Sequence, residues 1–155
     1  AAVDRLDLHR YMGTWYEIAR FDHRFERGLS EVTATYTLMP DGTVRVENRG
    51  CKHKKPYDVC KTAEGRAKIP DPSQPGKLKV SFFLSFYSDY YVLELDQDEY
   101  NYALIGSSSD KYLWILSRAP ILPEEIKKKL LDATTRRGYD VKKLIWVEQR
   151  EKKIM

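Results

Sequence analysis

Residues 32–47 read VTATYTLMPDGTVRVE, and the order of residue types in this stretch decides the class of fold. Apolar residues alternate with threonine over residues 32–38, which is the period-two pattern of a half-buried strand. The turn sequence Pro40-Asp41-Gly42 follows, and valine then alternates with charged residues over 44–47. The stretch therefore predicts an antiparallel hairpin with one face in water.

Runs of the same kind lie on both sides of this hairpin. They cover residues 11–23, 59–69, 77–82, 90–95, 100–106 and 111–117, and residues 50–57 between two of them read as a loop tip. A helix is predicted from Pro123 to Gly138, because Glu124 and Glu125 favour the positive end of the helix dipole. A last strand is predicted over 144–148.

Eight antiparallel strands at this spacing can pair with their neighbours and close on themselves. The sequence therefore predicts an all-β, eight-stranded up-and-down barrel, with one C-terminal helix packed outside and a short final strand. Such a barrel either fills with side chains or holds one small ligand. The residues expected inside are small enough to leave room, namely Ala19, Ala34, Ala63, Gly65, Ala67 and Ala103. A packed barrel with no cavity fits the periodicity equally well.

Composition excludes several classes of protein. A chain of 155 residues, 42% hydrophobic and 32% charged, fits a single ordered domain. Lys and Arg number 27 against 23 Asp and Glu, and the net charge of +4 is too small and too dispersed for a nucleic-acid binder. No apolar run approaches the roughly 18 residues that span a bilayer. No cofactor is expected, and no metal site, because the two cysteines lack a second pair and the histidines lack ligand spacing.

The segment Gly13-Thr14-Trp15 resembles the Gly-x-Trp signature of the lipocalins. In that family an arginine at the end of the last barrel strand packs across the tryptophan, and Arg118 occupies that position here. By this resemblance Gly13, Trp15 and Arg118 are expected to form the floor of the barrel. A guanidinium over an indole contributes about 0.5 to 2 kcal/mol to stability. The alternative for Trp15 is an ordinary core tryptophan. The family's middle motif is only partly present, as Asp96 followed by Tyr100.

Residues 16–26, 78–83, 112–118 and 145–147 are similar to the bacterial outer-membrane lipoprotein lipocalins, which are relatives of apolipoprotein D. This resemblance implies one lipocalin domain over 1–155, with 149–155 as a charged tail. It also implies transport or storage of a fatty acid or lysophospholipid at the periplasmic side of the outer membrane. An N-terminal lipid-bearing cysteine, expected to be absent from this chain, would attach the protein to the membrane. A homodimer through an exposed apolar patch is a further possibility.

The ligand is expected to lie inside the barrel and to reach its open mouth, formed by loops 22–29, 50–58, 83–89 and 107–110. Basic residues there would attract a phosphate or carboxylate, although residues 52–55 also fit a solvated loop. The expected ligand-binding residues are Ala19, Phe21, Ala34, Tyr36, Val46, Ala63, Val80, Phe82, Tyr90, Val92, Ile105, Tyr112, Trp114, Arg24 and Lys54.

Three residues carry separate expectations. Alternation points Glu17 inward beside Trp15, where an unpaired carboxylate would be costly, so Glu17 should meet a cation or a tyrosine, or read a ligand group. Cys51 and Cys60 leave the two strands around one loop and are expected to form a disulfide there. The alternative, a catalytic thiol, has precedent in one lipocalin branch, but neither cysteine lies on a matching strand.

Nothing in the sequence favours an enzyme. His9, His23 and His53 lie in three separate segments, and Ser107-Ser108-Ser109 lacks the Gly-x-Ser-x-Gly turn of a hydrolase. We therefore expect no catalytic residues. The alternatives to a lipid carrier are an enzyme acting on a bound lipid or pigment, and a barrel with a filled interior that only makes protein contacts.

Overall fold

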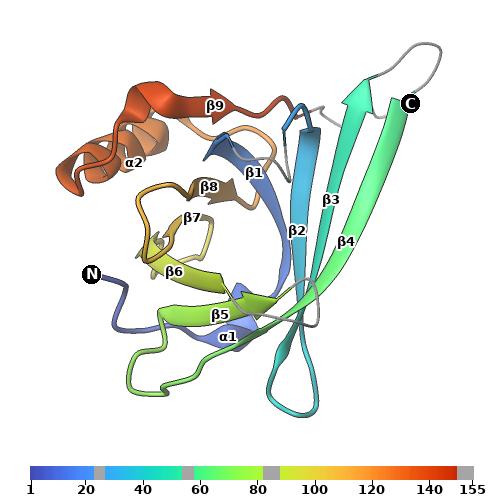
Figure 1. Ribbon diagram of the computed structural model, residues 1–155. Helices are drawn as coiled ribbons and strands as arrows, with labels where there is room; N and C mark the ends of the chain where they lie inside the picture. The colour runs from blue at the N-terminus through green and yellow to red at the C-terminus, as the bar shows by residue number, and fades with distance from the viewer. Residues whose placement is uncertain (23–26, 54–57, 82–87, 150–155) are drawn as a thin grey trace.

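The computed structural model describes residues 1–22, 27–53, 58–81 and 88–149 (Figure 1). Nine strands are found in these ranges, and they belong to one sheet. They are β1 (Gly13–Phe21), β2 (Ser30–Leu38), β3 (Val44–His53), β4 (Asp58–Lys68), β5 (Lys77–Ser81), β6 (Ser88–Leu95), β7 (Tyr102–Gly106), β8 (Leu113–Ser117) and β9 (Leu144–Trp146). The helices are α1 (Leu8–Tyr11), α2 (Glu124–Arg136) and the 3-10 helix η1 (Val141–Lys143).

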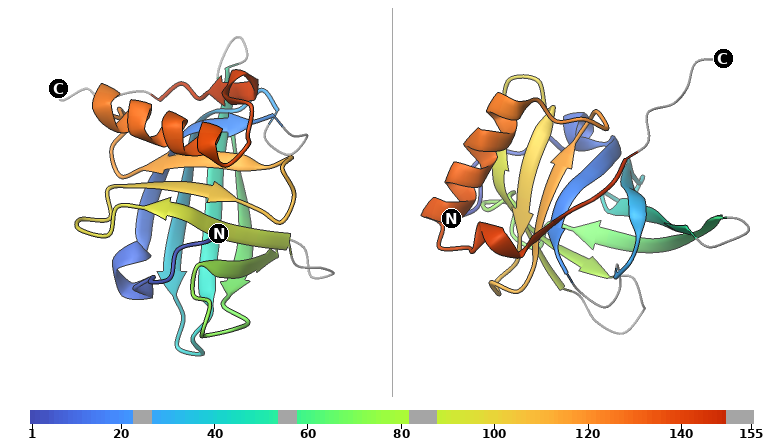
Figure 2. Two further views of the ribbon diagram at one scale, coloured as in Figure 1. Left: turned by 90° about the vertical axis from the view of Figure 1, so that its left-hand side faces the viewer. Right: turned by 90° about the horizontal axis from the view of Figure 1, so that it is seen from above.

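The sheet closes into a barrel because β1 pairs with β8 along one edge and with β2 along the other. From β2 to β8 each strand pairs antiparallel with the next one in the chain, which is the up-and-down order. The ninth strand, β9, adds to β1 from outside this ring. The predicted eight-stranded antiparallel barrel with an external C-terminal helix is confirmed (Figures 1 and 2).

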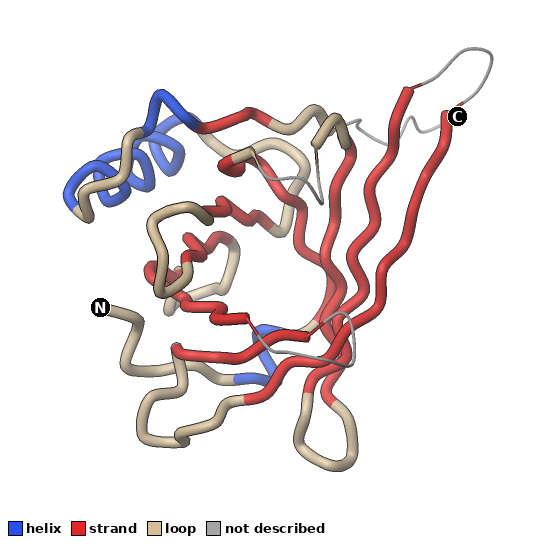
Figure 3. Tube along the Cα trace, viewed as in Figure 1, coloured by secondary structure: helices blue, strands red, loops and turns tan. Residues whose placement is uncertain are grey.

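Several elements differ from the expected ones, among them the short helix η1, which was not predicted. Helix α1 was not predicted, because four residues are too few to show a helical period; Asp7 caps it by accepting hydrogen bonds from the N–H groups of His9 and Arg10. Strand β3 continues to His53, into the expected loop tip, because it pairs with β4 at every position (Figure 3). Strand β9 ends at Trp146, two residues earlier than predicted.

A β-bulge in β1 reverses the expected directions of several side chains. Glu17 lies opposite Leu116, but Ala19 lies opposite Ile115, so one extra residue is inserted at Ile18. After the bulge Arg20 shares the inner face with Glu17. The expectation that Ala19 and Phe21 line the interior is therefore wrong: both pack in the apolar cluster outside the barrel.

Two apolar clusters hold the fold together. The inner cluster fills the barrel around Trp15, Val92 and Ile105, which are fully buried. The outer cluster lies between helix α2 and the outer surface of β1, β7 and β8 (Figure 2), and it includes Leu130 of the helix with Leu104 and Ile115 of the barrel. Strand β1 consequently has apolar contacts on both faces. No helix in the described ranges is long and apolar enough to cross a membrane.

The last described residues form hydrogen bonds with β1 and β2 where these two strands no longer pair with each other. These two strands pair only from Gly13↔Tyr36 to Tyr16↔Thr33, and beyond that point β9 takes the edge of β1. The segment 144–149, called here the C-terminal strap, then bridges to β2. The N–H of Glu31 donates to the main-chain oxygen of Glu148 at 2.7 Å, and the Gln149 amide donates to the main-chain oxygens of Glu17 (2.7 Å) and Val32 (2.9 Å).

Candidate functional site

The closed end of the barrel is built around Trp15 and Arg118. The guanidinium carbon of Arg118 lies 3.8 Å from the centre of the Trp15 ring, which is the contact that the sequence predicted. Arg118 also donates hydrogen bonds to the main-chain oxygens of Arg10 (2.7 Å), Thr14 (3.2 Å) and Tyr100 (3.2 Å). One side chain therefore ties α1, β1 and the β6–β7 turn together.

Gly13 is required by this arrangement for two reasons. Its φ is +102°, a backbone conformation that residues with a Cβ rarely adopt. A Cβ added there would also lie 3.2 Å from Nη1 of Arg118, closer than ordinary van der Waals contact. The glycine of the motif thus makes room for the arginine that covers the tryptophan.

Above this floor, three buried tyrosine hydroxyls join across the interior. The Tyr90 hydroxyl lies 2.6 Å from that of Tyr11 and 2.8 Å from that of Tyr36, and we call these three residues the tyrosine bridge. Burial is the main cause that raises the pKa of Tyr11 and of Tyr90 well above its usual value. The nearby Tyr36 adds to the rise at both residues, whereas the hydrogen bond with Tyr90 partly offsets it at Tyr11. Tyr11 and Tyr90 are therefore neutral at physiological pH.

The barrel is almost completely filled around the tyrosine bridge. A cavity of about 10 Å³ remains there, which is about the space of one water molecule. Its lining is formed by Leu8, Tyr11, Met12, Tyr36, Val44, Ala67, Leu78, Val80 and Tyr90. The filled interior that the sequence left open as an alternative is thus the state of this end of the barrel.

Toward the open end, side chains on the inner face are accessible to solvent. The strand register places Ala34, Asn48 and Ala63 on the same face as Trp15. Trp15 is buried, Ala34 and Asn48 are half-buried, and Ala63 is exposed. On β8, Trp114 packs against the inner cluster and Tyr112 stacks on it at 5.9 Å between ring centres. We call the inner-face residues Ala34, Asn48, Ala63, Tyr112 and Trp114 the upper chamber.

A buried ion pair lies on the inner face of β1. Glu17 and Arg20 are 5% and 2% exposed, and Nη1 of Arg20 donates to Oε2 of Glu17 at 3.1 Å. Arg20 also donates to the main-chain oxygen of Leu29. Glu17 thus meets a cation, as its inward position required. The bulge at Ile18 makes the pair possible, because it brings residues three apart onto one face.

The remaining expected site residues fall into two groups. Val46, Val80, Val92 and Ile105 are buried in the inner cluster, so they face the interior as expected. Phe82, Arg24 and Lys54 lie outside the described residues. Asn48, which the sequence analysis did not select, belongs to the upper chamber, and its alternation with Val44 and Val46 could have identified it.

The open end carries cations on its inner face. Lys52 and Lys61 lie on the inner faces of β3 and β4. Each is the next inner-face residue toward the open end, after Gly50 on β3 and after Ala63 on β4. Lys52 is half-buried and Lys61 is exposed. Beside them, Cys51 and Cys60 lie directly opposite each other and form the predicted disulfide, which excludes either as a free catalytic thiol.

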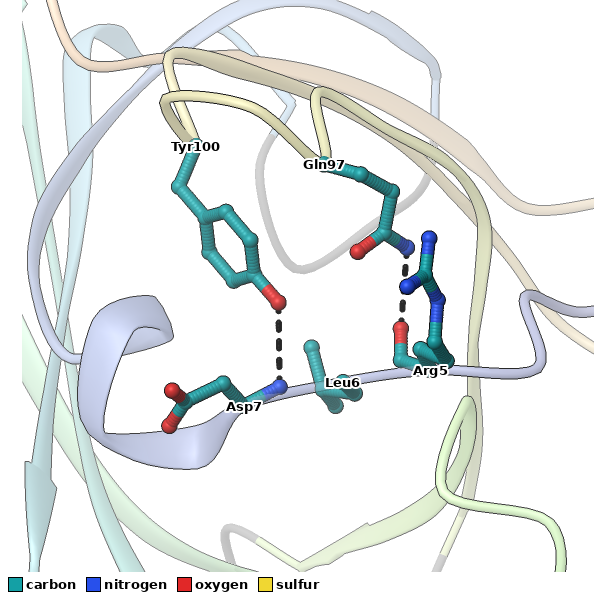
Figure 4. Close-up of a pocket in the computed structure, with 5 residues that line it drawn as sticks. All are labelled: Arg5, Leu6, Asp7, Gln97 and Tyr100. Carbon is teal, nitrogen blue, oxygen red and sulfur yellow. Dashed lines mark hydrogen bonds between the residues drawn. The ribbon is translucent and has the colours of Figure 1, made fainter.

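A second pocket lies outside the barrel at its closed end, with a volume of about 410 Å³ (Figure 4). Arg5, Leu6, Asp7, Gln97 and Tyr100 line it. The N–H of Asp7 donates to the Tyr100 hydroxyl at 3.0 Å, and the Gln97 amide donates to the Arg5 oxygen at 2.9 Å. These bonds hold residues 5–7 against the β6–β7 turn. The pocket is therefore the space between this segment and the turn.

A closed eight-stranded barrel with one plugged end and one accessible end is a container for a small apolar ligand. Residues 6–149 match the family model of the lipocalin-like domain. The chain belongs to the lipocalin family, whose members bind small hydrophobic ligands.

Relatives with established names share most of the chain. The outer membrane lipoprotein Blc of Escherichia coli (strain K12) is 49% identical over 147 residues, which cover 95% of this chain and 81% of the relative. Temperature-induced lipocalin-1 of Arabidopsis thaliana is 43% identical, covering 92% and 78%. Apolipoprotein D of Mus musculus is 34% identical, covering 94% and 78%.

Solved structures agree on the fold. Insecticyanin from the tobacco hornworm Manduca sexta superposes with a TM-score of 0.75 at 24% identity, covering 97% of this chain and 84% of that one. The cockroach allergen Per a 4 superposes with a TM-score of 0.73 at 19% identity, covering 97% and 92%. At these identities the likeness extends to the fold alone.

Proposed function

We propose that the protein binds and carries a lipid with a single acyl chain, a fatty acid or a lysophospholipid, in the upper chamber. The observation that carries this proposal is the accessibility of inner-face residues: Ala63 is exposed, although Gly65 and Ala67, the next residues on the same face of β4, are buried. Trp114 and Tyr112 provide a flat apolar wall in the same chamber. The expected lining residues Ala34, Ala63, Tyr112 and Trp114, with Asn48, would contact the chain.

Burial of the acyl chain would supply the affinity. About a dozen methylenes at about 0.8 kcal/mol each give a gross gain near 10 kcal/mol, before the cost of ordering the chain. The net binding free energy that is left after this cost is compatible with micromolar or tighter binding.

The head group would be held at the open end by cations. Lys52 and Lys61 lie on the inner face there, and Arg24 and Lys54, expected at the mouth from the sequence, lie outside the described residues. These cations would attract a phosphate or carboxylate more strongly than the upper chamber, where the polar Asn48 is uncharged and the nearby Arg20 is already paired with Glu17. The ligand would therefore bind with its tail toward the tyrosine bridge and its head at the mouth.

We place the protein at the periplasmic side of the outer membrane. Relatives that are 46% and 49% identical are named outer membrane lipoproteins, and a disulfide fits an oxidising compartment.

A homodimer is a further element of the proposal, since Ile145 and Trp146 on β9 are 39% and 43% exposed. Sedimentation of the Trp146→Ser variant against the unchanged protein would test the dimer.

Two measurements test the carrier function. Native mass spectrometry of protein purified from cells should show a bound lipid, and a fluorescent fatty acid should bind and be displaced by palmitate. Trp114→Ala should weaken this binding at least about tenfold, through lost apolar contact. Trp146→Ala is the matched control, because this tryptophan is on the outer edge strand β9. Absence of both a copurified lipid and fatty-acid binding would refute the proposal, and a ligand recovered chemically altered would favour an enzyme.

A further inference from the structure

We infer that the tyrosine bridge of Tyr11, Tyr36 and Tyr90 sets the depth of the ligand site, and so limits the length of acyl chain that the barrel accepts. This inference rests on the proposed function and adds the selection of ligand by chain length. The three tyrosines would then be specificity-determining residues, with the limit set by their rings.

The bridge crosses the barrel between opposite walls. Tyr36 belongs to β2 and Tyr90 to β6. These strands are separated by β3, β4 and β5 in one direction around the ring, and by β1, β8 and β7 in the other. Their hydroxyls nevertheless lie 2.8 Å apart, so the two side chains together span the interior. A chain that enters from the open end meets them before it reaches the floor.

The third member ties this span to the plug of the closed end. Tyr11 is the last residue of α1, and its hydroxyl lies 2.6 Å from that of Tyr90. Its ring lies 5.0 Å from the ring of Trp15 and 5.4 Å from that of Tyr36. Trp15 is in turn covered by Arg118. The bridge therefore rests on the closed end of the barrel, and this support opposes its displacement by an apolar tail.

Space beyond the rings is present but too small for a chain. The cavity of about 10 Å³ beside the bridge is lined otherwise by apolar side chains of α1, β3, β4 and β5, including Leu8, Val44 and Leu78. This space corresponds to about one water molecule, so it does not admit a run of methylenes. Removal of one tyrosine ring would join the cavity to the interior above it, and the lining would accept further methylenes.

Chain-length profiles test the inference. We would measure displacement of a fluorescent fatty acid by octanoate, dodecanoate, hexadecanoate and octadecanoate for the unchanged protein and three variants. Each further buried methylene strengthens binding about fourfold, since it contributes about 0.8 kcal/mol. For the unchanged protein the gain should stop at a definite length. For Tyr36→Ala it should continue to longer chains.

Two control variants separate the ring from other effects. Tyr36→Phe keeps the ring and loses one hydroxyl, so its limit should equal that of the unchanged protein. Tyr91→Ala removes a tyrosine on the same strand as Tyr90, at the adjacent position that packs with the outer cluster, and should also leave the limit unchanged. A limit that stays at the same length in Tyr36→Ala would overturn the inference.

A second measurement needs no variant. In a crystal of the unchanged protein with a fatty acid brominated at its terminal carbon, the bromine should lie on the open side of the bridge. A bromine found against Leu8 or Met12 would overturn the inference, as would affinity that rises without limit through octadecanoate. Failure of every fatty acid to bind would instead refute the proposed function itself, so the two failures are distinguishable.

Discussion

Arg20 donates a 3.1 Å hydrogen bond to Glu17 from the inner face of the same strand, and both side chains are nearly inaccessible to solvent. Removing one partner of such a pair leaves a buried charge without compensation, which costs about 3 to 5 kcal/mol. We expect Arg20→Met to lower the free energy of unfolding by about that amount in urea titration. The double variant Glu17→Leu/Arg20→Met should recover most of the loss. An equal loss in the double variant would show that the unpaired charge of Glu17 does not cause the loss of stability in Arg20→Met.

The contact between Arg118 and Trp15 should be the main stabiliser of the closed end. Arg118→Ala removes the cation–π contact and three hydrogen bonds to main-chain oxygens. The expected loss in the free energy of unfolding is about 3 kcal/mol. Arg118→Lys keeps the charge but cannot reach three carbonyls at once, so it should lose about half as much. Equal stability of the three proteins would contradict this role.

The disulfide should stabilise the β3–β4 arm without taking part in chemistry. Cys51 and Cys60 are separated by nine positions in sequence, and closing a loop of this size stabilises a fold by about 2 to 3 kcal/mol. The variant Cys51→Ala/Cys60→Ala should unfold at correspondingly lower urea concentration, as should the unchanged protein with a reductant. A reductant should have no effect on the double variant, which serves as the control.

Stability should fall at alkaline pH because of the tyrosine bridge. Burial raises the pKa of Tyr11 and of Tyr90, so both keep their protons in the folded barrel where unfolded tyrosines, with a pKa near 10, have lost them. The folded state then binds more protons than the unfolded one. The contribution of these groups is complete below about pH 10 and is lost as pH rises above it, by about 1.4 kcal/mol per pH unit for each tyrosine.

Urea titrations on both sides of this pH would check the slope. Tyr90→Phe should make the alkaline slope shallower by about 1.4 kcal/mol per pH unit, because one titrating hydroxyl is gone. An unchanged slope in Tyr90→Phe would show that the alkaline loss arises elsewhere. The half-buried Tyr102 on β7, which accepts a hydrogen bond from Lys129 outside the barrel, offers a control in Tyr102→Phe.

The sequence predicted the barrel well because most strands have one polar face. Over 32–38 and 44–47 the alternation of residue types is clear, and the structure follows it. The floor was predicted from the Gly-x-Trp motif and the distant Arg118, two signals that have meaning only together. Asp7 could also have indicated α1, since aspartate is a preferred N-cap residue.

The inner face of β1 could not be predicted in the same way. Residues 17–21 are buried on both sides, against the inner cluster and against α2, so hydrophobicity does not distinguish the two faces. A bulge adds one residue and leaves no mark in composition, yet it exchanges the directions of Ala19 and Arg20. The tyrosine bridge also depends on tertiary structure, because its members come from α1, β2 and β6.

The C-terminal strap has a consequence for how this barrel folds. The edge of β1 beyond Tyr16 is completed by residues 144–149, which are distant from β1 in sequence. A folding intermediate in which the strap has not yet docked therefore exposes an unpaired strand edge, and such edges invite aggregation. A chaperone that shields this edge until the strap docks would avoid the hazard, and a chain cut before Leu144 would keep it permanently.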